Sequence, residues 1–206
     1  MADNFKDTQG ILLQGHIKIH DPESGEIIVD KRNAIHYENM SISLAESLSN
    51  AGQGWINEMS FGNGGTSVDP TGVITYLTPN STGVNASLYN QTFTKVVDDR
   101  SVNNIDPSRN KTEIRHISGT NYTDILVTCL LDYGEPNGQD AFDTASDADN
   151  SFVFDELGLR SASTDGVLGN GRLLTHVIFH PVQKSLNRLI QVDYTVRVQS
   201  LSGGNS

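Results

Sequence analysis

Residues 61–80, FGNGGTSVDPTGVITYLTPN, form a glycine-rich stretch of the kind that can cradle a phosphate. Phosphate-binding loops of the P-loop type follow G-x-x-x-x-G-K-S/T, in which the lysine meets the phosphates and the hydroxyl meets magnesium. These twenty residues contain no lysine, arginine or histidine, and Asp69 would repel a phosphate. We therefore predict that the glycines form turns between strands and bind no nucleotide.

Two histidine pairs with a spacing of four residues, His16/His20 and His176/His180, are candidate zinc ligands. In a β-strand this spacing spans roughly 13 Å, which is too far for one zinc ion. The alternating, β-branched surroundings of both pairs favour strands. We expect no metal site from either pair, whereas a site built from separate strands stays open.

The acidic segment 134–151 has the oxygen-rich composition of a calcium loop. Counted from Asp147, an EF-hand requires glycine at its sixth position and glutamate at its twelfth, where this chain has Phe152 and Gly158. The EF-hand is excluded. A non-standard calcium site remains an alternative to a mobile, solvated loop, which is the reading we favour.

Neighbouring carboxylates are the remaining candidates for acid–base catalysis, at Asp98-Asp99 and Asp155-Glu156. Adjacent residues of a strand point to opposite faces, so neither doublet is expected to converge on one reacting atom. The sequence has no G-x-S-x-G nucleophile motif, and Cys129 lies in an apolar run that predicts an inert, buried thiol. We predict no catalytic residues, no cofactor and no enzymatic activity.

The charge composition of the chain limits the classes of partner that it is expected to bind. The 206 residues carry a net charge of −11, from 25 acidic and 14 basic side chains. This balance disfavours nucleic acid, because binding to its backbone depends on lysine and arginine. No apolar run approaches the ~20 residues of a membrane helix, and the polar N-terminal sequence does not resemble a secretory signal. We expect one domain, residues 1–206, with neither nucleic acid nor membrane as a partner.

The elements that position these residues are expected to be β-strands. Apolar side chains alternate with polar ones along residues 189–199, which is typical of an antiparallel strand with one face in solvent. Turn sequences separate further segments of this kind. The predicted strands are 11–19, 26–30, 55–61, 73–77, 88–97, 111–117, 124–132, 152–159, 173–180 and 189–199, the first two forming a hairpin over about 10–30.

Helical periodicity is confined to one segment. Met40, Leu44 and Leu48 recur every four residues and share a helix face, with Asn39 as the expected N-cap and Gly52 just past the end. We therefore predict an all-β, antiparallel β-sandwich or barrel-like domain with one short amphipathic helix near residues 39–50.

Two stretches resemble tail-collar, tail-fibre and baseplate proteins of tailed bacteriophages. The first is the glycine-rich corner of residues 55–66, which continues to Thr78-Pro79 and residues 88–92. The second runs from FVFDELGL at residues 152–159 to GRLLTHVIFHPVQK at residues 171–184, and a closing period-two strand follows it. In this resemblance, Glu156 is an inward or edge carboxylate that ties backbone amides at the Gly158 corner.

Residues 16–48 also resemble uncharacterised virion proteins of marine and cyanobacterial phages. The resemblance implies a virion structural protein that forms homo-oligomers and contacts other virion proteins. The chain carries no long fibrous repeat, so a tail, baseplate, neck or fibre-adaptor role is favoured over direct receptor binding. Alternatives are a capsid decoration protein and a carbohydrate-binding β-sandwich in which Trp55 stacks on sugar. The expected interface loops contain Asn63, Thr66, Asp69, Asp143 and Asp147.

Overall fold

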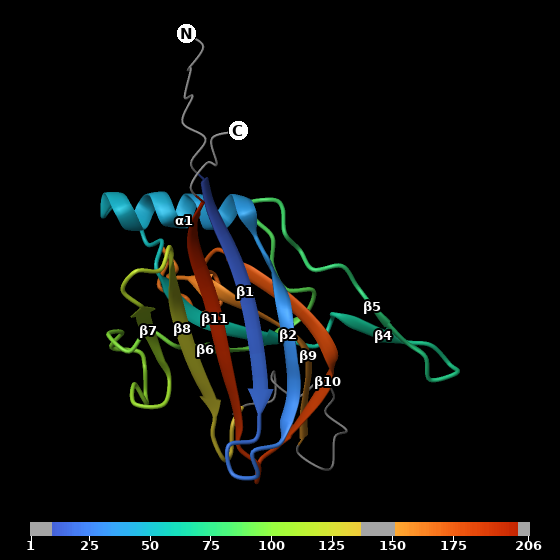
Figure 1. The fold of residues 1–206 in the computed structure, drawn as a ribbon. Coiled ribbons are helices and arrows are strands. Elements are labelled where there is room, and N and C mark those ends of the chain that lie inside the picture. Colours follow the sequence, from blue (N-terminus) through green and yellow to red (C-terminus); the bar gives the residue numbers. More distant parts are fainter. Residues whose placement is uncertain (1–9, 137–150, 202–206) are drawn as a thin grey trace.

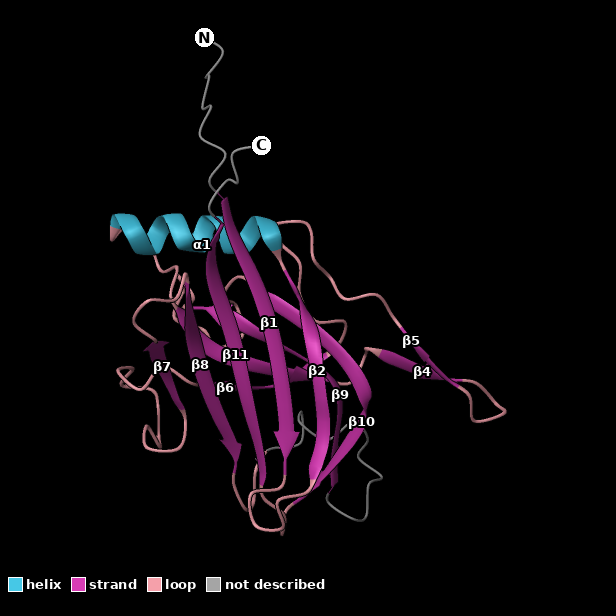
Figure 2. Cartoon of the chain, viewed as in Figure 1, coloured by secondary structure: helices cyan, strands magenta, loops and turns pink. Residues whose placement is uncertain are grey.

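The computed structural model describes residues 10–136 and 151–201, which form eleven β-strands and one α-helix (Figure 1, Figure 2). Asp143 and Asp147 of the expected acidic loop lie outside the described residues. The elements are β1 (Gly10–His20), β2 (Ile27–Ile35), α1 (Tyr37–Ser49), β3 (Ile56–Gly62), β4 (Thr66–Val68), β5 (Ile74–Tyr76), β6 (Gln91–Val96), β7 (Lys111–His116), β8 (Tyr122–Leu131), β9 (Ser151–Ser161), β10 (Thr175–Ser185) and β11 (Ile190–Leu201).

Nine strands form one antiparallel sheet in the order β6-β3-β9-β10-β2-β1-β11-β8-β7. The sheet curls into a half-barrel, and α1 crosses one end of it (Figure 1). β4 and β5 pair with each other in a separate two-stranded sheet. The prediction of an all-β, barrel-like fold with one short helix is confirmed.

The core fills the hollow of the half-barrel and follows the period-two pattern of the sequence. In β11, Val192, Tyr194 and Val196 are buried, while the residues between them are half-exposed. They pack against Phe61 of β3 and Phe154 of β9, which belong to the same apolar cluster from the other half of the sheet. Complete burial of such a side chain contributes about 1.5–3 kcal/mol, so this cluster is the main source of stability.

The two ends of the sheet approach each other without strand pairing. In the part of the chain that the structure describes, β6 pairs with β3 alone and β7 with β8 alone. Side chains bridge the gap instead. Lys95 of β6 donates from Nζ to the carbonyl of Leu130 at 2.7 Å, and Thr112 of β7 donates to the carbonyl of Val97 at 3.0 Å.

The N-cap of helix α1 lies three residues earlier than predicted. His36 caps it, with Nδ1 accepting the backbone N–H of Asn39 at 3.2 Å. Asn39 is instead buried, and its amide donates to the carbonyls of Leu173 at 3.0 Å and Val84 at 3.3 Å. The predicted cap was wrong because Asn39 joins the helix to distant loops, contacts that no local signal encodes. The helix ends at Asn50, which has a left-handed conformation.

Several strand boundaries also differ from the prediction. β6 begins at Gln91 rather than Leu88, because the amides of Tyr89 and Asn90 bind the carboxylate of Glu156 rather than a neighbouring strand. β10 continues past Pro181 to Ser185, since the proline sits within a break in the pairing register with β9. β2 extends to Ile35, and β4 was not predicted.

Candidate functional site

A cluster of buried, hydrogen-bonded polar groups surrounds Glu156 in β9. Its carboxylate accepts backbone N–H groups from Asn90 at 2.8 Å, Tyr89 at 2.9 Å and Gly64 at 3.2 Å. His176 of β10 supplies a fourth hydrogen bond, from Nε2 at 2.9 Å, and neither side chain is exposed to solvent. The ring is fully engaged, because its Nδ1 accepts the backbone N–H of Asn80 at 2.8 Å.

Asp155, the preceding residue of β9, binds the next amides of the same glycine-rich loop. Its carboxylate accepts the N–H groups of Gly65 at 2.9 Å and Thr66 at 2.8 Å, and also the Thr66 hydroxyl. A side chain at Gly65 would not fit, since a Cβ there would lie 2.9 Å from Cγ2 of Ile178. The loop amides thus bind anions, but these anions are the protein's own carboxylates.

The two carboxylates have opposite pKa shifts. Burial raises the pKa of Asp155, and the hydrogen bonds from Thr66 and Gly65 only partly offset this. Burial alone would also raise the pKa of Glu156, but the hydrogen bonds from His176, Asn90 and Tyr89 together hold it below its ordinary value. Such a divergent pair can mark an acid–base site. Here, however, both carboxylates are buried, and their hydrogen bonds hold loop amides against strand β9.

Arg160 of β9 is another buried charged side chain, and it also hydrogen-bonds to groups inside the protein. It donates to the hydroxyls of Ser60 at 3.1 Å and Ser87 at 2.6 Å and to the carbonyl of Gly171 at 2.7 Å. Burial lowers its pKa to about 10, against the opposing effect of Glu58. This arginine holds three segments of chain together.

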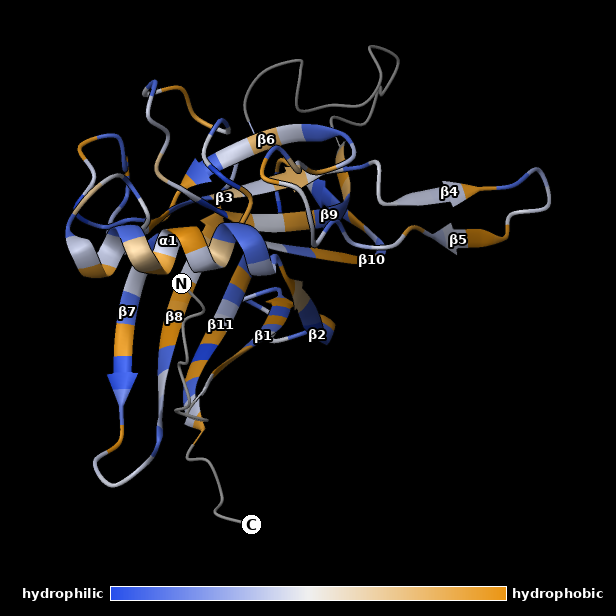
Figure 3. Ribbon diagram, turned by 90° about the horizontal axis from the view of Figure 1, so that it is seen from above, coloured by the Kyte–Doolittle hydropathy of each residue, from blue (hydrophilic) through white to orange (hydrophobic). Residues whose placement is uncertain are grey.

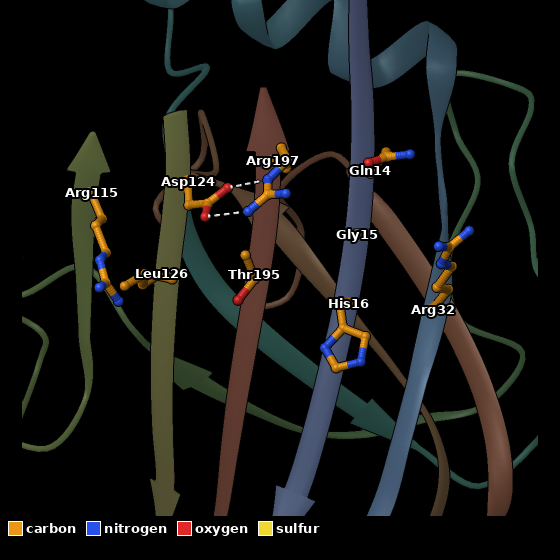
Figure 4. A pocket seen from close by; sticks show the side chains of 9 residues that line it. All are labelled: Gln14, Gly15, His16, Arg32, Arg115, Asp124, Leu126, Thr195 and Arg197. Atoms are coloured by element: carbon orange, nitrogen blue, oxygen red, sulfur yellow. Dashed lines mark hydrogen bonds and ion pairs between the residues drawn. The ribbon is translucent and has the colours of Figure 1, made fainter. Parts of the chain in front are cut away.

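A polar surface hollow crosses five adjacent strands, β7, β8, β11, β1 and β2 (Figure 4). It has a volume of about 380 Å³. Arg197 forms a two-pronged ion pair with Asp124 at 2.7 and 2.9 Å and stacks over the ring of Tyr122. Arg32 and Arg115 line the same hollow and have no ion pair among the described residues. The hollow is locally positive in an acidic protein.

A second hollow, the apolar cleft, lies between α1 and the inner face of the sheet, with a volume of about 260 Å³. Its walls include Met40 and Leu44 of α1, Ile114 of β7 and Val198 of β11. Trp55, the single tryptophan of the chain, is at this cleft and is 40% exposed. Arg100 is the one charged residue that lines it.

β4 and β5 form an arm, residues 66–77, that projects away from the body (Figure 1, Figure 3). Hydrophobic residues lie toward its outer end, where Val68 pairs with Ile74 and is 63% exposed. Tyr76 is 50% exposed but lies at the base, where it pairs with Thr66 and its hydroxyl is 3.3 Å from Nδ1 of His180. The base of the arm is held by the carboxylate of Asp155 and by a hydrogen bond from Leu77 N–H to the carbonyl of Gly65 at 2.9 Å.

The structure places the predicted interface residues of this region at different points of the arm. Asn63 and Thr66 are at its base, where each is hydrogen-bonded internally, to Asn90 and Asp155 respectively. Asp69 lies in the exposed turn at the tip, where it accepts the amides of Thr71 and Val73. Of these three residues, Asp69 alone is exposed, whereas Asn63 and Thr66 are half-buried.

Asp155 and Glu156 were expected not to converge on one reacting atom. In the structure both accept amides of the loop of residues 64–66 but share no donor, since Glu156 binds Gly64 and Asp155 binds Gly65 and Thr66. The expected partner of Glu156 requires correction. Glu156 does tie backbone amides, but those of residues 64, 89 and 90 rather than the Gly158 corner.

Sequence reasoning also missed three features. It considered His176 only as a zinc ligand, which it rejected, and did not predict its hydrogen bond with Glu156, a contact that depends on the pairing of β9 with β10. It missed the arginines of the polar hollow, which come from separate strands. It predicted only one strand of the arm, although the alternation on both sides of the turn at Asp69 was a usable signal.

Within residues 10–136 and 151–201, no group of three or more histidine, cysteine or acidic side chains is arranged to hold a metal ion. In the same ranges no helix has the length and apolar character needed to cross a bilayer. Comparisons with family models, with curated protein sequences and with solved structures found no match for this chain. Its class is therefore defined by the fold alone: a half-barrel of antiparallel strands with a projecting arm.

Proposed function

We propose that this protein is a non-enzymatic structural component of a tailed-phage virion, acting in the tail, baseplate or neck, or as a fibre adaptor. It works by binding copies of itself and neighbouring virion proteins. The single observation that carries the proposal is the arm. It is anchored at its base by buried hydrogen bonds, yet it presents exposed apolar side chains.

The interior polar cluster is consistent with this role. Glu156, Asp155 and His176 are the residues best suited to catalysis, and each is buried with its hydrogen bonds used inside the protein. A general base must reach the proton that it removes. These groups instead make the base of the arm rigid, which lowers the entropy lost when the arm docks.

The edges of the sheet also suit assembly. β7 is an edge strand, and its Ile114 is 77% exposed. Unpaired strand edges are templates for pairing with another chain unless they are covered. In a virion such edges are covered by neighbouring subunits, usually in a symmetric arrangement.

The test is the position of the protein on the particle. Antibodies raised against the purified chain are expected to label virions of the phage that encodes it, at the tail, baseplate or neck. Averaged electron micrographs of labelled particles give the position. Label on the head surface would favour the alternative of a capsid decoration protein, and unlabelled particles would refute the proposal.

A second candidate, carbohydrate binding during host attachment, is favoured by the polar hollow. Arg32 and Arg115, which form no ion pair within residues 10–136 and 151–201, are suited to bind the carboxylates of an acidic glycan, because the planar guanidinium matches carboxylate geometry. Trp55, the expected stacking residue, lies at the apolar cleft instead. Glycan binding that is lost in Arg115→Ala and kept in Trp55→Ala would support this candidate, and absence of binding across an array of acidic glycans would remove it.

A further inference from the structure

Strand β7 is the more exposed edge of the nine-stranded sheet. Within residues 10–136 and 151–201 it pairs with β8 alone, so alternate backbone groups of this strand point away from the sheet. The side chains of residues 113–116 are all exposed, and β7 lies at the outer margin of the sheet (Figure 3). The other edge strand, β6, is less accessible, because its side chains are all buried or half-buried. The edge of β7 is therefore a template for a strand of another chain.

The two faces of β7 differ in chemistry. Lys111, Glu113 and Arg115 alternate along the outer face, where Arg115 lines the polar hollow. Thr112 and Ile114 lie on the inner face, where both line the apolar cleft. Directly opposed residues of an antiparallel pair share one face of the sheet. A strand that pairs with β7 must therefore match its charges on the outer face and its apolar side chain on the inner face.

A second copy of β7 meets both requirements. In a two-fold symmetric, antiparallel pair centred on Ile114, this residue lies opposite Ile114 of the second copy, and Glu113 lies opposite Arg115. The symmetry forms this Glu–Arg pair twice. Within the chain, Asp124 is the residue opposite Arg115 in β8, but Arg197 already holds its carboxylate in a two-pronged ion pair. The contact thus supplies Arg115 with a carboxylate and covers Ile114, which is 77% exposed.

The charges of β7 disfavour the neighbouring registers that keep both faces matched. A pair centred one residue earlier would oppose Glu113 to itself and Lys111 to Arg115. A pair centred one residue later would oppose two copies of Arg115. A pair centred two residues earlier would set Ile114 opposite Asn110, which is buried and polar. Like charges directly opposite each other destabilise a sheet, so the register centred on Ile114 is favoured.

We propose that two copies of this protein pair through β7, in an antiparallel, two-fold arrangement centred on Ile114 that joins their sheets edge to edge. The contact uses the same surface of both copies, so it closes at a dimer. A pairing over residues 112–116 is small, and we expect dimers at high protein concentration and monomers on dilution. This inference rests on the proposed function, which it deepens by naming the surface through which copies bind each other.

Charge reversal at either end of the Glu–Arg pair is the first test. Glu113→Arg and Arg115→Glu each bring like charges together in a homodimer, and both positions are exposed, so both variants are expected to fold. Light scattering after size-exclusion chromatography at high concentration is expected to show dimers of the unaltered chain and monomers of each variant. Arg32→Glu, at an exposed arginine of the same hollow but on the interior strand β2, is the matched control and should remain dimeric.

Mixing the two variants is the decisive measurement. When a Glu113→Arg chain meets an Arg115→Glu chain, an arginine faces a glutamate at both positions, so a 1:1 mixture is expected to recover the dimer mass. A contact through another surface would instead leave each variant dimeric on its own. That result, a mixture that stays monomeric, or an unaltered chain that is monomeric at high concentration would each overturn the inference.

A cysteine at the centre of the pair tests the register. Directly opposed residues of an antiparallel pair have Cα atoms about 4.5–5.5 Å apart, within the ~4.4–6.8 Å that a disulfide spans. Ile114→Cys is therefore expected to form a covalent dimer on mild oxidation. Val102→Cys, at a residue that is 98% exposed, is the control and should stay monomeric, and the native Cys129 is completely buried. Equal cross-linking of the two variants would contradict the register.

The outcomes also distinguish this inference from the proposed function. A chain that remains monomeric at all concentrations, yet labels virions, refutes the β7 contact and leaves the structural role standing. A chain that dimerises through β7, yet is absent from particles, retains the contact and refutes the structural role.

Discussion

Glu156 illustrates how single residues decide what this protein can do. Four donors surround its carboxylate, three of them backbone amides and the fourth His176. A carboxylate with four donors is stable as the anion, and the lowered pKa expresses that preference. The same saturation leaves no lone pair for a substrate.

Replacement of Glu156 by glutamine is expected to lower the free energy of unfolding by about 3 kcal/mol at neutral pH. Glutamine has one acceptor oxygen, and its amide nitrogen would face N–H groups that are themselves donors. Equilibrium unfolding in urea measures the loss. Glu113→Gln, at an exposed glutamate of β7, is the control and should change stability little.

The deficit of Glu156→Gln is expected to shrink in acid. A carboxylate whose folded pKa is lowered contributes stability above the unfolded pKa, near 4.5, and loses it as the pH falls through the folded value. Protonated Glu156 resembles glutamine in charge, so the two proteins converge at low pH. Unfolding curves measured at a series of pH values check this, and a deficit that grows in acid would contradict it.

At the scale of elements, the arm depends on the strand beside it. The carboxylate of Asp155 in β9 accepts the amides of Thr66, the first residue of β4, and of Gly65, which precedes it. Its raised pKa indicates that burial of this charge costs free energy. The hydrogen bonds from Thr66 and Gly65 offset part of this cost and hold the start of the arm against β9.

Substitution Asp155→Ala is expected to loosen the arm more than it destabilises the protein. Loss of the acceptor frees the amides of Gly65 and Thr66, so hydrogen exchange across residues 65–77 should accelerate while the core strands remain protected. Thr66→Val, which removes only the hydroxyl contact, is the milder control. Unchanged exchange in the arm of Asp155→Ala would show that the carboxylate does not anchor it.

At the scale of the whole molecule, one apolar cluster joins both halves of the curled sheet. Cys129 of β8 is completely buried within this cluster. Burial raises the pKa of its thiol to about 12, so the reactive thiolate is absent at neutral pH. The cysteine is therefore a reporter of the integrity of the core.

Cys129 is expected to resist thiol reagents in the native protein and to react only as the chain unfolds. Trp55 lies near α1, away from the centre of the core, so its fluorescence reports on a different region. If residues 10–136 and 151–201 unfold as one cooperative unit, labelling and fluorescence should share one denaturant midpoint. Separate midpoints would indicate independently unfolding parts.

The sequence by itself determined the class of fold. Alternation along residues such as 189–199 is a local property, and so is the turn chemistry at Asp69, whose carboxylate binds amides within four residues. The absence of lysine from the glycine-rich loop argued against a P-loop, and this too is a property of neighbouring residues. Local signals of this kind can be recognised without knowing which segments pair in the sheet, which is why most strands were predicted.

Only the tertiary structure decided what those elements bring together. Gly64 and Glu156 are 92 residues apart, and their hydrogen bond depends on how β3 and β9 pair, which the strand sequences do not specify. The apolar cleft likewise depends on strand order, because its lining combines residues of β1, β7, β8 and β11 with residues of α1. Hydrogen bonds and packing between distant segments follow from register and curvature, and these arise from the whole sheet rather than from any one segment.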